Sequence, residues 1–178
     1  MRSFKTEGIV IRRRNVGEAD RLLTIFTKHH GKITVKAKGV RKISSRRSSH
    51  IELLNLVNLS LYRGRINPIL TEVETIENFS GAKDNLNSVG FAYHVCELID
   101  SLCAENQENS RVFNLLCEIL SHLSLESNHV VAISKFEKEL LDALGFNSQS
   151  EYLNSQGLIE EIIERRLKAK RILPLFTD

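Results

Sequence analysis

The residues in this sequence that are best suited to chemistry are cations. Between positions 28 and 47 the chain carries eight Lys and Arg residues and no Asp or Glu. Such cations repel one another unless an anion joins them, and a nucleic-acid backbone is an anion of this kind. Ser44 and Ser45 add hydroxyl groups that suit phosphate oxygens. We therefore predict a surface that binds the backbone with weak sequence preference, and a merely solvated charged face is the plainer alternative.

The sequence contains few patterns that are typical of a catalytic site. The sequence has no Gly-rich phosphate loop with Lys and Ser or Thr, no nucleophile elbow and no pair of histidines spaced around a Glu. Glu72, Glu74 and Glu77 could be the metal ligands of a nuclease, but an exposed strand face explains them, since positions two apart share a side. The three cysteines lack the paired spacing of zinc ligands. We expect no catalytic residue, no metal and no cofactor, and hence a protein that is not an enzyme.

Charge is unevenly distributed along the chain. Residues 1–80 hold 16 Lys and Arg against 7 Asp and Glu, a net charge of +9, whereas residues 81–178 hold 9 against 15, a net charge of −6. The odd number of cysteines and the lack of a secretory signal or of an apolar run of about 18 residues predict a reduced, cytoplasmic protein without a membrane partner. DNA binding would associate it with the nucleoid.

The elements that must position the cations are short strands. Alternation of apolar and polar residues, broken by turn residues, predicts strands at 6–13, 21–27, 32–40, 53–62 and 69–77. In the third strand Ile33, Val35 and Ala37 should face the core, and the alternate residues Lys32, Thr34, Lys36 and Lys38 should face solvent. Five strands in about 75 residues suit a small closed barrel of the oligonucleotide/oligosaccharide-binding (OB) type.

The period changes from two to about 3.6 after residue 79. Apolar stripes predict three amphipathic helices within residues 86–102, 112–123 and 130–144, and a last helix at 158–173. Asp84 or Asn87, Asn109 or Ser110, and Asn128 are the candidate N-caps, and Gly145 suits the position after a helix. The predicted fold class is α+β, with an OB-type barrel domain at 1–80 and a helical domain at 81–178.

Two further cationic clusters lie beside turns of this barrel. The predicted DNA-binding residues are Arg12, Arg13, Arg14, Lys32, Lys36, Lys38, Arg41, Lys42, Arg46, Arg47, Arg63 and Arg65. The loops after strand one and between strands four and five line the binding face of an OB barrel, so this fold would gather the clusters. Tyr62, His29 and His30 are the aromatic candidates nearby, which favours binding by charge over base stacking.

Several motifs resemble one bacterial family. The runs are EGIVIRRR from Glu7, GEADRLLTIFT from Gly17, HGKI from His30, AKGVR from Ala37, LYRG from Leu61 and FEKELLDALG from Phe136. In this order and spacing they resemble the recombination mediator family RecO. The resemblance implies binding of single- and double-stranded DNA, annealing of complementary strands, and help in loading RecA onto DNA coated by single-stranded-DNA-binding protein. It also implies RecR and the acidic C-terminal tail of the coating protein as partners.

Two departures from the family bear on partners and metal. Many members carry a four-cysteine zinc motif after the position of Gly145, and residues 146–157 here contain no cysteine. The helical half is also shorter than in the usual member. For the acidic tail we predict a site at Arg165, Arg166 and Lys170, which surround apolar residues, although a helix whose cations complement its own dipole is an alternative. The competing hypothesis for the whole chain is an adaptor that recruits RecR-type partners with little DNA binding.

Overall fold

The computed structural model describes residues 2–125, 128–146 and 155–164. The chain divides into two compact units, one formed by Met1–Asn78 with Ala104–Ser110 and the other by Phe79–Cys103 with Arg111–Asp178. Strands form the first unit and helices the second, so the predicted α+β class is confirmed. None of the helices in the described ranges combines the length and apolarity needed to cross a membrane.

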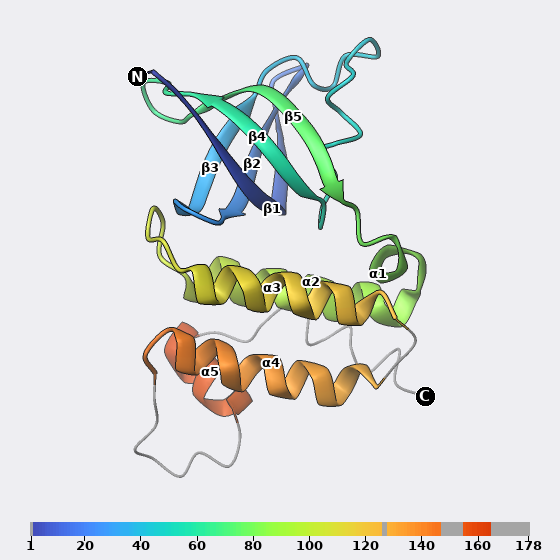
Figure 1. Cartoon of the computed structure of the whole chain (residues 1–178), viewed down its shortest axis with the longest axis vertical. Helices are drawn as coiled ribbons and strands as arrows, with labels where there is room; N and C mark the ends of the chain where they lie inside the picture. The colour runs from blue at the N-terminus through green and yellow to red at the C-terminus, as the bar shows by residue number, and fades with distance from the viewer. Residues whose placement is uncertain (1, 126–127, 147–154, 165–178) are drawn as a thin grey trace. The chain divides into compact units, whose positions relative to one another are not determined.

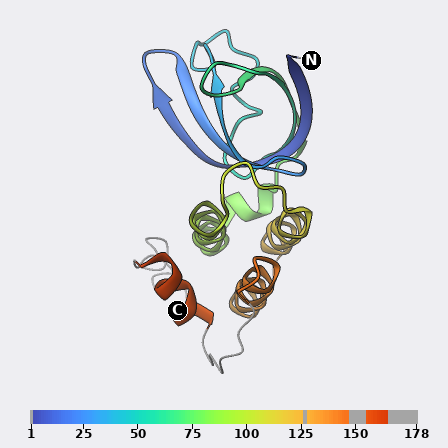
Figure 2. The same cartoon turned by 90° about the vertical axis from the view of Figure 1, so that its left-hand side faces the viewer.

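Five strands close the first unit into a barrel. They are β1 (Ser3–Val16), β2 (Asp20–Thr27), β3 (Gly31–Ala37), β4 (Leu56–Tyr62) and β5 (Ile69–Glu77), in the order β1-β2-β3-β5-β4. Figures 1 and 2 show the strands curled around one interior. The long β1 pairs with β4 through its first half and with β2 through its second, with a register shift between Val10 and Arg12. Such a shift bends a strand, which allows β1 to form hydrogen bonds with both β4 and β2.

Alternation along the strands fills the barrel interior. Ile33, Val35 and Ala37 of β3 are buried as predicted, and they pack in one cluster with residues such as Leu23 and Leu59 from other strands. Burying such aliphatic side chains supplies the main driving force for folding the unit. Outward positions on the strands are left for polar and charged groups.

Two predicted strands are shorter in the structure, because residues beside them adopt left-handed backbone conformations. Gly39 has φ +67°, so β3 ends at Ala37 rather than continuing to residue 40. Leu54 has φ 69°, so β4 begins at Leu56 rather than at residue 53. A left-handed residue breaks the extended ladder, and for leucine this conformation is uncommon.

Residues 104–110 belong to the barrel unit although the chain reaches them after a helix. Lys32 forms an isolated bridge with Glu105, and its carbonyl accepts a 2.9 Å hydrogen bond from the amide of Asn106. Gly31, at φ +62°, lies so close to this segment that an added Cβ would be 1.9 Å from the carbonyl oxygen of Gln107. The hairpin glycine is therefore also a packing position.

The second unit contains α1 (Ser80–Asp84), α2 (Leu86–Leu102), α3 (Ser110–Leu123), α4 (His129–Ala143) and α5 (Ser155–Ile163). Figure 2 looks nearly along α2, α3 and α4. Asn128 caps α4 as predicted, but α2 is capped by Asn85, whose side chain accepts from the amide of Asn87 at 2.9 Å. The predicted helix at 158–173 corresponds in part to α5, and the rest lies outside the described residues.

A buried polar pair joins α2 to α4. His94 and Glu137 are each 1% exposed, and His94 Nε2 lies 2.8 Å from Glu137 Oε1. The hydroxyl of Ser155 in α5 donates to the other carboxylate oxygen at 3.2 Å. Buried polar groups need such partners, so this network links three helices of the unit.

Candidate nucleic-acid interface

The connection between β3 and β4, residues 38–55, is called the basic loop here, and Figure 1 shows it leaving the barrel as a long excursion. Its first part folds into tight turns, with the amide of Lys42 donating to Gly39 and the amide of Ser45 donating to Lys42 at 2.9 Å. Its last part is held by Asn55, whose side-chain amide donates to the carbonyls of Ser49 and His50. The basic loop therefore has an internal hydrogen-bond scaffold.

Arginines tie the basic loop to the rest of the barrel. The Arg47 guanidinium donates to the carbonyl of Leu70 at 3.0 Å and to that of Lys38 at 2.9 Å. The Arg41 guanidinium donates to the carbonyl of Gly17 at 3.0 Å, in the turn between β1 and β2. All these acceptors are neutral carbonyl oxygens. The two guanidinium groups thus hold the loop in place while their positive charge remains.

Asp20, the first residue of β2, holds the start of the basic loop, and both of its carboxylate oxygens are engaged. One oxygen accepts from the amide of Gly39 at 2.9 Å and the other lies 3.2 Å from Lys36 Nζ. The Gly39 amide, followed by the Lys36 ammonium, lowers the pKa of the Asp20 carboxyl below its usual value. Asp20 therefore remains ionised near neutral pH, and it fastens the start of the basic loop to β2.

A pocket of about 600 Å³ lies between the basic loop and the β1–β2 turn. Its lining residues are Ala19, Asp20, Lys38, Gly39, Lys42, Ser44, Ser45, Arg46 and Arg47. Four cations thus face a space that contains one acid. The Ser45 hydroxyl oxygen is buried, and among the described residues it has no hydrogen-bond partner. A pocket with four cations and one acid suits an anion with several oxygen atoms, such as a phosphate group.

The other predicted DNA-binding residues lie outside this pocket. Arg13 forms an ion pair with Glu52, and neither it nor Arg12 and Arg14 is among the described residues that line the pocket. Arg63 and Arg65 are exposed in the turn between β4 and β5 and are also not part of the lining. The structure therefore assembles one of the three clusters into a pocket.

The predicted exposure of Lys32 on β3 is wrong. Lys32 was expected on the solvent face, but it is 8% exposed, because residues 104–110 cover its position. Lys36 does lie on the outward side and is engaged by Asp20. A covering segment that is remote in sequence leaves no trace in the alternation of β3 itself, so the pattern could not reveal it.

Two of the three candidates for base stacking, His29 and His30, have other contacts. The His29 ring nitrogen lies 3.4 Å from Glu108, and the His30 ring packs edge-on against Phe4. Tyr62 is 38% exposed at the end of β4. These contacts give further reason to favour charge over stacking.

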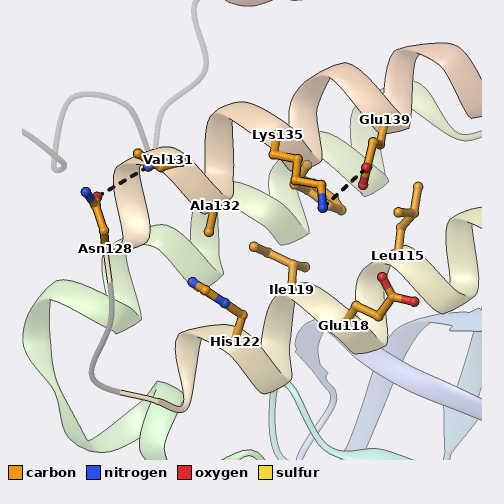
Figure 3. Close-up of a pocket in the computed structure, with 10 residues that line it drawn as sticks. Leu115, Glu118, Ile119, His122, Asn128, Val131, Ala132, Lys135 and Glu139 are labelled. Atoms are coloured by element: carbon orange, nitrogen blue, oxygen red, sulfur yellow. Dashed lines mark hydrogen bonds and ion pairs between the residues drawn. The ribbon is translucent and has the colours of Figure 1, made fainter.

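A second hollow, of about 460 Å³, lies in the helical unit between α3 and α4 (Figure 3). Apolar side chains such as Ile119 and Val131 form much of its wall. Its charged residues include Glu118, Glu139 and Lys135, and Lys135 lies 3.8 Å from Glu139. Acids therefore outnumber lysines, which does not match an acidic peptide. The predicted site for such a peptide, at Arg165, Arg166 and Lys170, lies outside the described residues.

Metal-ligating side chains do not gather within the part of the chain that the structure describes, since it holds no group of three or more His, Cys, Asp or Glu residues suited to an ion. Cys96 and Cys103 are buried and Cys117 is partly buried. Burial, with a smaller contribution from Asp100, raises the pKa of the Cys96 thiol to about 12. A thiol held protonated in this way is a packing group rather than a nucleophile.

The barrel unit and the helical unit define a class of two-domain protein in which an OB-type domain precedes a helical domain along the chain. Comparison with known families finds two matches: residues 1–79 match the family described as recombination protein O N terminal, and residues 83–152 match recombination protein O C terminal. The chain belongs to the recombination protein O (RecO) family, which confirms the resemblance seen in the motifs.

Individual relatives agree with the family assignment. The chain is 40% identical over 148 residues to a DNA repair protein RecO of Roseiflexus sp., a match that covers 83% of this chain and 52% of that protein. It is 35% identical over 146 residues to a DNA repair protein RecO of Dehalococcoides mccartyi, covering 82% of this chain and 58% of that protein. The chain spans a little over half the length of these curated relatives.

Proposed function

We propose that this chain is a DNA-binding recombination mediator in DNA repair. It binds single- and double-stranded DNA through the phosphate backbone, anneals complementary strands and helps load a recombinase onto DNA that is coated by single-stranded-DNA-binding protein. The observation that carries this proposal is the pocket at the basic loop, which is lined by Lys38, Lys42, Arg46 and Arg47 and by a single acid, Asp20.

The chemistry of the pocket favours a phosphate ligand for two reasons. Several cations around one space raise the free energy of the empty site, and an incoming anion relieves this repulsion. The pocket also offers hydrogen-bond donors, because its lining includes lysine ammonium groups, arginine guanidinium groups and the exposed Ser44. Contacts of this kind position a nucleic acid without reading its sequence, which suits a protein that must act on any damaged site.

The proposed partners follow from the family and not from a site that the structure describes. They are RecR, the acidic tail of the single-stranded-DNA-binding protein and, indirectly, RecA. In this proposal the protein acts at the nucleoid in the cytoplasm and brings strands and proteins together without a covalent step, so it is not an enzyme.

Binding of labelled DNA at 50 and 200 mM salt tests the proposal. If each of the four pocket cations neutralises one phosphate of a duplex, their share of the slope of log K against log salt is about −3.6, which weakens binding about 150-fold over this range. Strand annealing should then be measured with and without the cognate coating protein. A chain that binds RecR but shows neither DNA affinity nor a salt slope would be the adaptor of the competing hypothesis.

A further inference from the structure

An exposed apolar side chain lies among the cations of the basic loop. Ile43 is fully exposed, with a relative accessibility of 108%. Its neighbours in the chain are Lys42 and Ser44, and the exposed cations Arg41 and Arg46 lie within three residues of it. Single exposed apolar residues are common on protein surfaces, and Ile66 is 91% exposed on the same barrel. The position of Ile43 among phosphate-binding cations, rather than its exposure alone, is therefore what points to a partner.

The basic loop holds Ile43 outward by its own structure. Ile43 lies inside the turn closed by the 2.9 Å hydrogen bond from the Ser45 amide to the Lys42 carbonyl. The Arg41 amide donates to the carbonyl of Ala19 at 3.0 Å on one side, and Ser48 donates to the Ser45 carbonyl on the other. Because the turn is fixed on both sides of Ile43, its exposure is a property of the folded loop.

The surroundings of Ile43 indicate what it contacts. Lys42 and Arg46 line the anion pocket, whereas Ile43 is not among its lining residues and stands beside it. A nucleic acid presents the same alternation, because charged phosphates flank apolar base faces along each strand. An apolar group next to phosphate-binding cations therefore matches a base next to its own phosphates.

We propose that Ile43 is a wedge that inserts between neighbouring bases of bound single-stranded DNA, while Lys42 and Arg46 hold adjacent phosphates. The inference rests on the proposed function and adds a contact with bases to it. Aliphatic wedges of this type part stacked bases, and isoleucine has no aromatic face with which to continue the stack. A single strand is the least costly substrate for this, because its bases are held by stacking alone.

The wedge predicts an optical signal. 2-Aminopurine between adenines in a single strand is quenched by stacking, so its emission should rise about twofold or more when the parent protein parts the bases. Ile43→Ala should lose most of this rise and bind about threefold to tenfold more weakly, whereas its salt slope should equal that of the parent because no charge has changed. Ile43→Leu keeps an aliphatic wedge and should retain the signal.

Ile76 supplies the matched control. It is 51% exposed on β5 of the same barrel, and its neighbourhood includes the exposed acids Glu74 and Glu77, which disfavour phosphate. Ile76→Ala should behave as the parent in both emission and affinity. A full emission rise with Ile43→Ala, or loss of the rise with Ile43→Leu, would overturn the wedge.

The salt slope separates failure of the wedge from failure of the proposed function. If Ile43→Ala keeps the parent's emission and slope, DNA binding stands and Ile43 has no part in it. If Ile43→Ala changes only the binding of a protein partner such as RecR, the exposed side chain is a protein contact and the wedge is likewise refuted. If the parent itself shows no binding and no slope, the proposed function fails and the wedge fails with it.

Discussion

Replacing three pocket cations by alanine should remove most of the pocket's share of the salt dependence of DNA binding. Lys38, Lys42 and Arg46 are exposed and line the pocket, whereas Arg47 is left in place because its guanidinium tethers the basic loop to Leu70. Each lost phosphate contact removes about 0.9 from the duplex slope, so the pocket's share falls from about −3.6 to about −0.9. Between 50 and 200 mM salt, the corresponding loss of affinity falls from about 150-fold to about 3.5-fold.

The assay is fluorescence anisotropy with labelled duplex and single-stranded DNA over this range of salt. Single strands release fewer counterions, so the slope there should change by about 2.1 instead of about 2.7. Thermal unfolding of the variant confirms that the fold is intact, because the three side chains are exposed and their removal opens no cavity in the core.

A second triple variant separates local contacts from net charge. Lys5, Lys135 and Lys138 are also exposed lysines, and alanine at these three positions removes the same formal charge without touching the pocket. This control should keep the parent's slope. Equal slopes for the two triple variants would refute the assignment of the phosphate contacts to the basic loop.

Two further predictions concern stability. Gly31→Ala should lower the free energy of unfolding in urea by about 2–5 kcal/mol, because the added Cβ would clash with the Gln107 carbonyl and alanine disfavours the left-handed backbone at this position. Gly17→Ala should lower it by only about 1–2 kcal/mol, because Gly17 is left-handed at φ +58° but has open space around it. Equal losses would mean that residues 104–110 do not pack as described. Glu137→Leu should lower the free energy of unfolding by about 3–5 kcal/mol in the same assay, because it leaves His94 buried without its carboxylate partner. The double variant His94→Leu with Glu137→Leu should recover most of this loss, and a loss equal to the sum of the two single variants would contradict a buried pair.

Much of the barrel could be predicted from the sequence because its core follows a local rule. Period-two alternation placed Ile33, Val35 and Ala37 in the interior, and the structure agrees. The ends of the strands depend instead on backbone conformations that tertiary contacts impose. Leu54 is left-handed beside β4, and no property of leucine favours that conformation.

The site was less predictable than the fold, because composition identifies cations without showing what they contact. Lys36 and Lys38 are two residues apart on the sequence, yet the first is engaged by Asp20 and the second lines the pocket. Arg13 belongs to a conspicuous run of arginines and forms an ion pair with Glu52, which is 39 positions away. The barrel brings together residues that are this far apart in the sequence, and such contacts leave no periodic pattern in the sequence.

The contacts of the basic loop explain how a segment this rich in cations can hold one conformation before DNA arrives. Arg41 and Arg47 donate to neutral carbonyls, so they fasten the loop without neutralising their own charge. Asp20, the acid of the pocket, is occupied by the Gly39 amide and Lys36. In the proposed function the site is thus ordered and still strongly positive. DNA binding then costs little loop entropy, and the affinity is set by the phosphates that the pocket cations reach.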